Sequence, residues 1–288
     1  MSAISAPTAL SAAGWRDRLG RSSVAVTLAS IGFVLLLVAL IDPALLTKYN
    51  PTTINPVQSV MHPSASHWFG TDEDGRDEFS RVVYGTRPAL FVGVVGAGIG
   101  ALFGTSLGIV AGIGGRVPDA GVSRFTELLL AFPGLVFALF LAAFLGASVT
   151  VEAIAVGISN IPTFIRVTRA QALLVGRSQY VQAAGALGHS RARVIRRTIV
   201  PNVVRPLLAF TTLAIGQSIV WGTALSFLGL GAKPPTAEWS LMLSDSQSYL
   251  SVAWWLAVFP GLAIVCTSLS ITTLGAAVQR RIDGRERF

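Results

Sequence analysis

The stretch Tyr180-Val-Gln-Ala-Ala-Gly-Ala-Leu-Gly188 lies between two apolar segments, and an arginine cluster and Pro201 follow it. It predicts a short helix with almost no side-chain bulk, because most residues from 183 to 188 are alanine or glycine. Gly188 is of the residue type that commonly ends a helix. A helix with such small side chains can enter a groove on another protein, and we interpret it as a docking surface. The residues of this surface are Tyr180, Gln182, Ala183, Ala184, Gly185 and Gly188.

Four arginines follow the predicted helix, at positions 191, 193, 196 and 197. Their guanidinium groups can meet anionic lipid headgroups or acidic residues of a partner protein. Arg191 and Arg193 are the two closest to the helix, so we include them in the docking surface. Taken alone, the stretch would equally fit an ordinary positively charged loop, and the rest of the chain has to decide.

The composition of the chain places it in a lipid bilayer. Apolar residues make up 52% of the sequence and charged residues 12%, and the mean hydropathy is +0.64, all outside the range of soluble proteins. A spanning helix needs about 20 apolar residues. Five uncharged stretches of that order predict five transmembrane helices: between Arg21 and Asp42, Arg87 and Arg116, Glu127 and Glu152, Arg205 and Lys233, and Asp245 and Arg280.

A sixth span is expected between Glu152 and Tyr180. Its uncharged part, 153–165, is too short to cross alone, so Arg166 and Arg169 must reach the inner membrane surface with their long side chains. A re-entrant or interfacial segment is the alternative. The charge distribution favours the span, because six helices and a cytoplasmic N-terminus put seventeen of the 22 basic residues on the inner side.

We therefore predict an all-α membrane protein with six transmembrane helices and both termini in the cytoplasm. The apolar run after Leu19 is longer than the core of a cleavable signal and ends at Asp42-Pro43, which favours an uncleaved signal-anchor. The predicted layout is a tail 1–21, a first helix 22–46, an extracytoplasmic loop 47–87, a membrane core 88–279 and a tail 280–288. Within the core we expect helices at about 88–115, 121–146, 150–174, 201–230 and 251–279, with a cytoplasmic loop at about 177–197.

Several kinds of site are disfavoured by the sequence. The net charge of +8 could indicate nucleic-acid binding, but the cations flank apolar spans and no aromatic and basic platform accompanies them. Cys266 is the only cysteine, so a disulfide or a thiolate metal site cannot form within this chain. The histidines at 62, 67 and 189 fall in predicted loops, where we expect solvated or capping groups and no metal site.

Glycine recurs at every fourth position of the second predicted span, at Gly96, Gly100, Gly104, Gly108 and Gly112. Such a register leaves one helix face without side chains, and small residues at this spacing let two membrane helices approach closely. The pattern predicts tight packing on another helix, either of this chain or of a partner.

The predicted outer loop holds the acidic run Gly70-Thr-Asp-Glu-Asp-Gly-Arg-Asp77. Thr71 and Asp74 resemble a helix start, and Asp77 and Arg81 can pair one turn apart. With Phe79, Val82, Val83 and Thr86 on one face, we expect a short amphipathic helix on the outer surface. Calcium binding is the alternative, but no EF-hand spacing is present. The motif residues are Gly70, Thr71, Asp72, Asp74, Gly75, Arg76 and Asp77.

Aromatic residues near the expected outer ends of the spans fit an interfacial belt. We expect Trp254, Trp255 and Tyr249 at the outer boundary of the last span. Trp221 and Trp239 are expected to bracket the preceding outer loop.

Several motifs together resemble a known family. The spacing of Gln182-Ala183-Ala184, Gly188 and Pro201 is similar to the EAA loop through which membrane subunits of bacterial ABC importers dock their ATPases. Nearly everything after Trp68 resembles the dipeptide/oligopeptide/nickel permease family, most closely its C-type inner-membrane subunit. The motifs that carry this resemblance are Phe69-Gly-Thr-Asp-Glu-Asp-Gly-Arg-Asp77, Ser80-Arg81, Tyr84-Gly85, Leu130-Ala-Phe-Pro-Gly134, Ala224-Leu-Ser-Phe-Leu-Gly-Leu-Gly231, Pro234-Pro235 and Trp239.

The resemblance implies the type I ABC importer transmembrane fold, with the 180–188 helix as the coupling helix, in the bacterial inner membrane. It implies a heterodimer with a homologous second permease, two ATP-binding subunits that hold ATP and Mg, and an extracytoplasmic solute-binding protein. Peptides are the implied cargo, with nickel, haem or glutathione as alternatives. The chain lacks a phosphate-binding G-x-x-x-x-G-K-[ST] loop, so we expect no ATPase activity of its own. Gln182 replaces the glutamate usual in this loop, which removes a charge-assisted hydrogen bond.

Two other classes remain open. A secondary transporter driven by an ion gradient would show inverted repeats and ionisable groups inside the membrane. Pro133-Gly134 and Pro260-Gly261 interrupt two spans, but the halves share no other self-similarity. A membrane scaffold or channel subunit without coupling is the third class, and copurification of ATPase subunits distinguishes the three.

Overall fold

The computed structural model describes the backbone of residues 12–285 and the side chains of residues 24–280. The predicted tails 1–21 and 280–288 lie largely outside the described residues. Within the described part the chain is helical, and its only β-type pairing is an isolated bridge between Thr71 and Asp77. The α-helices are α1 (Ala12–Ile41), α2 (Glu78–Ile99), α3 (Thr105–Ile113), α4 (Arg116–Leu130), α5 (Gly134–Leu145), α6 (Val149–Gly176), α7 (Gln179–Ala186), α8 (Arg191–Val194), α9 (Val200–Phe227), α10 (Trp239–Ser246) and α11 (Trp255–Arg285).

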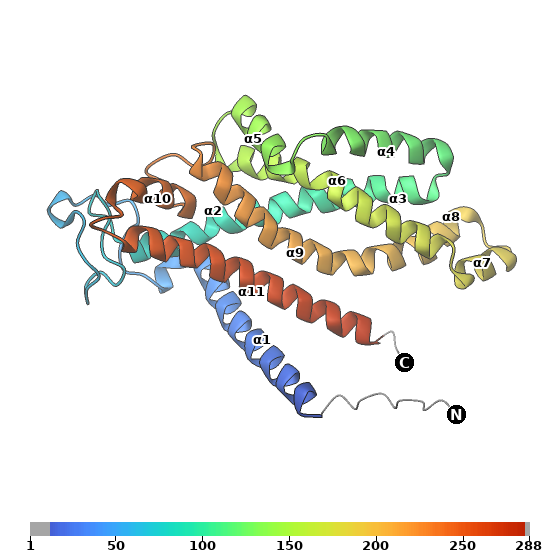
Figure 1. Cartoon of the computed structure of the whole chain (residues 1–288), viewed down its shortest axis with the longest axis horizontal. Helices are drawn as coiled ribbons and strands as arrows, with labels where there is room; N and C mark the ends of the chain where they lie inside the picture. Colours follow the sequence, from blue (N-terminus) through green and yellow to red (C-terminus); the bar gives the residue numbers. More distant parts are fainter. Residues whose placement is uncertain (1–11, 286–288) are drawn as a thin grey trace, which may run out of the picture.

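The long helices run along the long axis of the molecule and define two ends (Figure 1). One end holds the loop 42–77 together with α10, and we call it the loop end. The opposite end holds α7 and α8, and we call it the α7 end. Two π-helical segments, Gly100–Gly104 and Ile195–Ile199, join α2 to α3 and α8 to α9, so each pair forms one long rod.

Four helices of the described residues are long and apolar enough to cross a membrane: Val24–Ile41, Glu78–Ile113, Arg191–Phe227 and Trp255–Arg280. The predicted continuous helix 121–146 is wrong, because α4 and α5 meet at a bend of 79°. Pro133 lies at the bend, where it has no N–H to continue the hydrogen-bond ladder. If the bent pair counts as one span, there are five. The sixth span, α6, stays a prediction, although its 28 residues reach about 42 Å.

The predicted amphipathic helix on the outer surface does not exist as a separate element. Its residues form the first turns of α2, which begins at Glu78 and continues through the membrane-spanning segment. Asp77 caps this helix by accepting a hydrogen bond from the Ser80 N–H at 2.8 Å, so Thr71 and Asp74 are not its start. Arg87 and Pro88 do not interrupt the helix, because Pro88 is accommodated inside it.

The central helix is α6, which packs on α2, α3, α5 and α9. The glycine register lies against it, which shows that the partner of this face belongs to the same chain. A Cβ atom added to each of three glycines would come too close to a Cβ atom of α6. The distances are 2.7 Å for Gly100 to Asn160, 2.6 Å for Gly108 to Thr168 and 2.5 Å for Gly112 to Ala172. On Gly104 it would overlap the side chain of Phe164. The two backbones therefore approach as closely as bare glycine allows.

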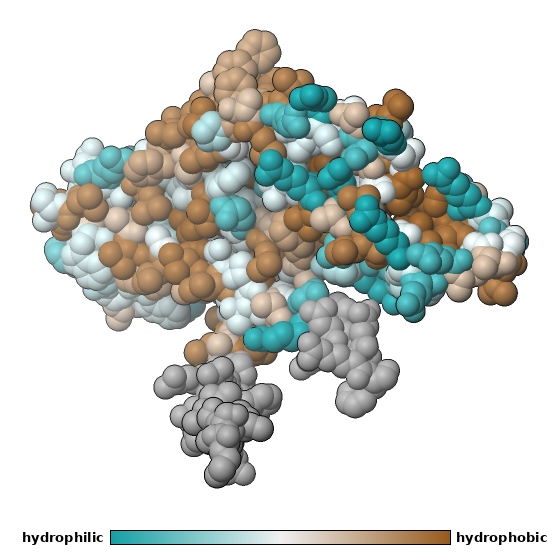
Figure 2. Space-filling model, turned by 45° about the vertical axis from the view of Figure 1, so that its right-hand side comes forward, coloured by the Kyte–Doolittle hydropathy of each residue, from teal (hydrophilic) through white to brown (hydrophobic). Residues whose placement is uncertain are grey.

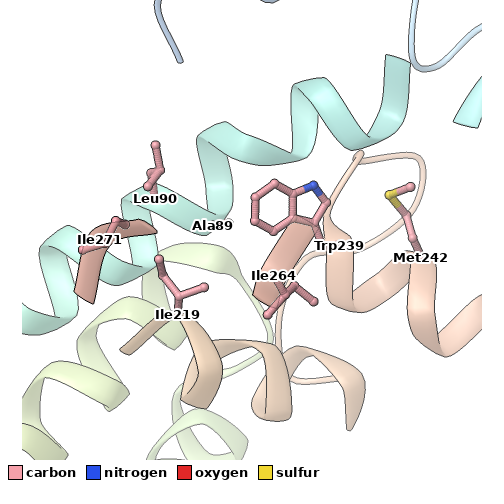
Figure 3. Close-up of a cluster of buried hydrophobic side chains, with 7 residues drawn as sticks. All are labelled: Ala89, Leu90, Ile219, Trp239, Met242, Ile264 and Ile271. Atoms are coloured by element: carbon pink, nitrogen blue, oxygen red, sulfur yellow. The ribbon is translucent and has the colours of Figure 1, made fainter. Parts of the chain in front are cut away.

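A second packing centre joins α2, α9, α10 and α11 near the loop end (Figure 3). Trp239 is its largest side chain, is 1% exposed and donates from Nε1 to the Val82 carbonyl at 2.7 Å. Trp255 is also fully buried and donates to the Thr71 carbonyl at 3.3 Å. Trp254 is exposed, whereas Trp239 and Trp255 are buried inside the protein, so the rings of these two do not contact lipid or water. Their position at the membrane boundary stays a prediction. Local sequence does not distinguish an exposed tryptophan from one that distant segments of the chain bury.

The outer surface of the helices is apolar. On α1, Leu28, Val34 and Leu35 are more than half exposed, and hydrophobic side chains spread over much of the visible face in Figure 2. Hydrophilic residues gather toward the α7 end in the same view. An apolar exterior of this extent fits lipid as the surrounding medium.

Candidate functional site

The helix α7 lies at the tip of the α7 end, between the end of α6 and the start of the α8–α9 rod (Figure 1). It has no buried residue. Tyr180 is 47% exposed and Leu187, directly after the helix, is 78% exposed. Its inner face packs through Val181 and Ala184 on an apolar cluster that includes Ala172 of α6 and Val203 of α9. The helix is therefore attached to two long helices on one side and free on the other.

The end of α7 is closed by Gly188, which has φ +77°. The His189 N–H donates to the Ala184 carbonyl at 3.2 Å, and the Leu187 N–H donates to the Ala183 carbonyl at 2.9 Å. A left-handed glycine with these bonds is the helix end that the sequence predicts. Gly185 is exposed to the space beside α7, and a Cβ atom there would meet no other atom within 4 Å.

The predicted polar residues around α7 are divided between two roles. The Gln182 amide donates to the Arg177 carbonyl at 3.2 Å, so it secures the start of the helix. Arg191 donates to the Ile113 carbonyl at 3.0 Å and closes the end of α3, so its guanidinium is already engaged within the chain. Arg193 is exposed and lies 3.4 Å from Nδ1 of His189. Both cations are exposed, but Arg191 is held by a distant backbone carbonyl whereas Arg193 contacts only a residue of the adjacent turn.

A hollow of about 480 Å³ lies behind α7. It is bounded by the ends of α3 and α6 and by α8, and Arg177, Val181, Gly185, His189 and Arg191 are among its lining residues. The hollow leaves part of α7 without close packing, while Val181 and Ala184 keep the helix in contact with α6 and α9.

The acidic motif at the loop end forms a buried charge network. Arg76 is 4% exposed and contacts Asp72 at 2.6 Å, Asp74 at 3.0 Å and Glu73 at 3.2 Å. Burial raises the pKa of the Glu73 carboxyl, and the nearby Asp72 charge raises it further, whereas its own backbone hydrogen bond and Arg76 lower it. Within the described residues, no group of three or more His, Cys, Asp or Glu side chains has an arrangement that could hold a metal ion.

Two predicted pairings in this motif differ in the structure. Arg81 pairs with Asp72 at 3.3 Å and not with Asp77. Asp77 instead binds Nδ1 of His67 at 2.8 Å and caps α2, and His67 is buried. The expectation that His67 is a solvated or capping group is therefore wrong: the loop 42–77 folds back over the start of α2 and buries it, and the cap is Asp77.

Three further polar interactions were not predicted from the sequence. Glu238 caps α10, accepting hydrogen bonds from the Ser240 and Leu241 N–H groups, and also receives the Ser226 hydroxyl. Asp119 of α4 forms a two-point ion pair with Arg169 of α6 at 2.5 and 2.8 Å. The Asp119–Arg169 pair joins residues 50 positions apart, so no local spacing signals it.

The residues 104–288 match the family described as "Binding-protein-dependent transport system inner membrane component". This match covers more than half of the chain, including α7 and its flanking helices. The chain belongs to this family. It is thus an integral membrane component of a transport system.

Similar proteins support the family assignment along nearly the whole chain. The permease is 38% identical over 272 residues to the dipeptide transport system permease protein DppC of Alkalihalophilus pseudofirmus, with 93% of this chain and 89% of that protein covered. It is 36% identical over 274 residues to the glutathione transport system permease protein GsiD of Pectobacterium atrosepticum, with 93% and 90% covered. The fold is shared with an amino acid ABC transporter (TM-score 0.57, 17% identity, 70% of this chain and 94% of that chain) and with the MetNI methionine ABC transporter (TM-score 0.59, 13% identity, 70% and 96%).

Proposed function

We propose that this permease carries peptides across the bacterial inner membrane as one of two homologous transmembrane subunits of an ABC importer. The observation that carries the proposal is α7, a bare helix that is exposed on one side and attached to α6 and α9 on the other. The names of the relatives support dipeptides as the cargo, with glutathione, itself a small peptide, as the second candidate.

In this proposal the α7 end faces the cytoplasm and α7 enters a groove of an ATP-binding subunit. ATP and Mg are bound by two such subunits. When they close on ATP, they displace α7, and because α6 and the α8–α9 rod extend from α7 to the loop end, the displacement reaches the outer end of the pathway (Figure 1). The pathway itself lies between this chain and the second permease, and a solute-binding protein delivers the peptide.

The substitution Gly185→Trp tests the role of α7. A Cβ atom at Gly185 meets nothing within 4 Å, and the hollow beside it has room for a larger side chain, so the variant is expected to fold and insert normally while the indole alters the surface that enters the ATPase groove. We expect peptide uptake and binding-protein-stimulated ATP hydrolysis to fall together by about tenfold or more, as for a bulky group placed in the centre of an interface. Both are measured on the complete complex reconstituted in proteoliposomes.

The matched control is Gly98→Trp, because Gly98 is also a helical glycine with open space around its Cβ position, but on α2. It is expected to leave uptake and stimulated hydrolysis unchanged. Wild-type coupling in Gly185→Trp would contradict the proposal. Uptake that needs an ion gradient and no ATPase subunit would show a secondary transporter instead.

A further inference from the structure

Apolar side chains are exposed at one tip of the loop 42–77. Val57 is 93% exposed and Ile54 is 57% exposed, and Pro56 between them is exposed as well. We call residues 54–57 the apolar tip. It lies in a stretch, 49–71, that contains no Asp, Glu, Lys or Arg. Depletion of charged residues around apolar ones is characteristic of the core of a protein–protein interface.

The acidic motif holds the apolar tip in one conformation. The Asn55 N–H donates to the Asp74 carbonyl at 3.0 Å, and the Val60 N–H donates to the Asp72 carbonyl at 2.9 Å. Gly75, at φ +75°, lies so close that a Cβ atom would overlap the Asn55 carbonyl oxygen. A short 3₁₀ helix, Pro56–Gln58, begins within the tip and ends one residue after it. A tip that is already ordered loses little conformational freedom on binding, which favours a role in recognition.

Lipid does not explain the exposed side chains of the apolar tip. The loop 42–77 lies at the loop end and extends past the ends of α2 and α11 (Figure 1). Its backbone is irregular and tied to Asp72 and Asp74, and irregular backbone facing lipid does not occur in the hydrocarbon region. In water, an exposed apolar patch marks a surface that another molecule covers.

We propose that the apolar tip is a contact site for the extracytoplasmic solute-binding protein, with Ile54 and Val57 entering an uncharged, apolar depression on that protein. The inference rests on the proposed function, which places the loop end outside the membrane. A second permease subunit that packs beside the spans lies at their depth in the membrane, whereas the loop 42–77, which carries the tip, extends beyond them along the long axis. A partner that arrives from the water phase and meets the loop end fits this position and its lack of charge.

The test uses the complete complex in proteoliposomes, titrated with its binding protein while ATP hydrolysis is measured. Ile54→Asp and Val57→Asp place a charge in the contact, so the binding-protein concentration for half-maximal stimulation is expected to rise by about tenfold or more. The maximal rate and the subunit composition are expected to stay as in the wild type. Val57→Thr, which keeps the shape and replaces one methyl group by an uncharged hydroxyl, is expected to have a smaller effect.

The control is Val252→Asp, which adds the same charge to a residue of the loop between α10 and α11 that is 61% exposed. It is expected to behave as the wild type. An equal effect of Val252→Asp, or unchanged half-maximal concentrations in Ile54→Asp and Val57→Asp, would refute the contact while the proposed function stands. Loss of the second permease from the variant complexes would assign the tip to the subunit interface instead. A wild-type complex that no binding protein stimulates would overturn the proposed function as well.

Discussion

Two glycines of this permease both have a positive φ and differ in their surroundings. Gly75 has φ +75° and Gly115 has φ +92°. A Cβ atom on Gly75 would overlap the Asn55 carbonyl oxygen, whereas one on Gly115 would meet nothing within 4 Å. The first glycine is needed for close approach and for its conformation, and the second for its conformation alone.

The pair allows the two effects to be separated. We expect Gly115→Ala to cost about 1–3 kcal/mol, because its backbone, with φ +92° and ψ −171°, lies in a region that is essentially confined to glycine. For Gly75→Ala we expect about 1–3 kcal/mol more, because the loop must shift to relieve the overlap. Thermal unfolding of the two purified variants in the same detergent measures the difference. Equal unfolding temperatures would show that Asn55 moves aside freely, and the apolar tip would then not be rigid.

At the scale of elements, the contact between the α2–α3 rod and α6 depends on the absence of side chains. Gly100, Gly104, Gly108 and Gly112 each face α6 at a distance that leaves no room for a methyl group, whereas Gly98 of α2 faces open space. In lipid, the hydrophobic effect does not drive apolar helices together. The two helices are therefore held in contact mainly by van der Waals packing along this face.

Gly104→Ala is therefore expected to destabilise the permease by about 1–3 kcal/mol, since its methyl group would overlap Phe164 and approach the Ile161 carbonyl at 2.7 Å. Gly98→Ala is the matched control and should leave stability unchanged or raise it slightly, because alanine favours the helix. Unfolding temperature and the yield of folded protein in membranes measure both. A Gly104→Ala variant as stable as Gly98→Ala would contradict the close packing.

At the scale of the whole molecule, the two ends differ in the kind of surface that they expose. The α7 end presents a bare helix with Leu187 78% exposed, and the loop end presents the apolar tip with Val57 93% exposed. If the rods cross the membrane, these two residues lie on opposite sides of it.

Cysteine labelling of intact cells tests this arrangement. Cys266 is the only cysteine and is replaced by serine in the background. The reagent is a charged maleimide, which does not cross the inner membrane, and the cells are first treated so that it passes any outer membrane. We expect Val57→Cys to react in these cells. Leu187→Cys is expected to react only after the inner membrane is opened. Labelling of Leu187→Cys in intact cells would invert the orientation and remove the basis for α7 as a cytoplasmic docking helix.

How far the sequence alone reaches depends on whether a feature is local. The apolar runs predict the rods, and the residues from Tyr180 to Gly188 predict α7 and its glycine end, because helix formation and capping are decided within a few residues. The family resemblance is also carried by short motifs. The four-residue glycine register predicts a tightly packed face, because helical periodicity fixes which residues share a face.

Only the tertiary structure decided what lies against these features. It placed the glycine face on α6 and buried His67 and Trp255 against the folded loop and Trp239 among four helices. It also joined Arg81 to Asp72 and bent the expected 121–146 helix at Pro133. Each of these outcomes depends on atoms that approach from distant parts of the chain. The sequence determines which kinds of contact a residue can make. Which partner it contacts depends on how the whole chain packs, because a close-packed interior accommodates only one arrangement of its side chains.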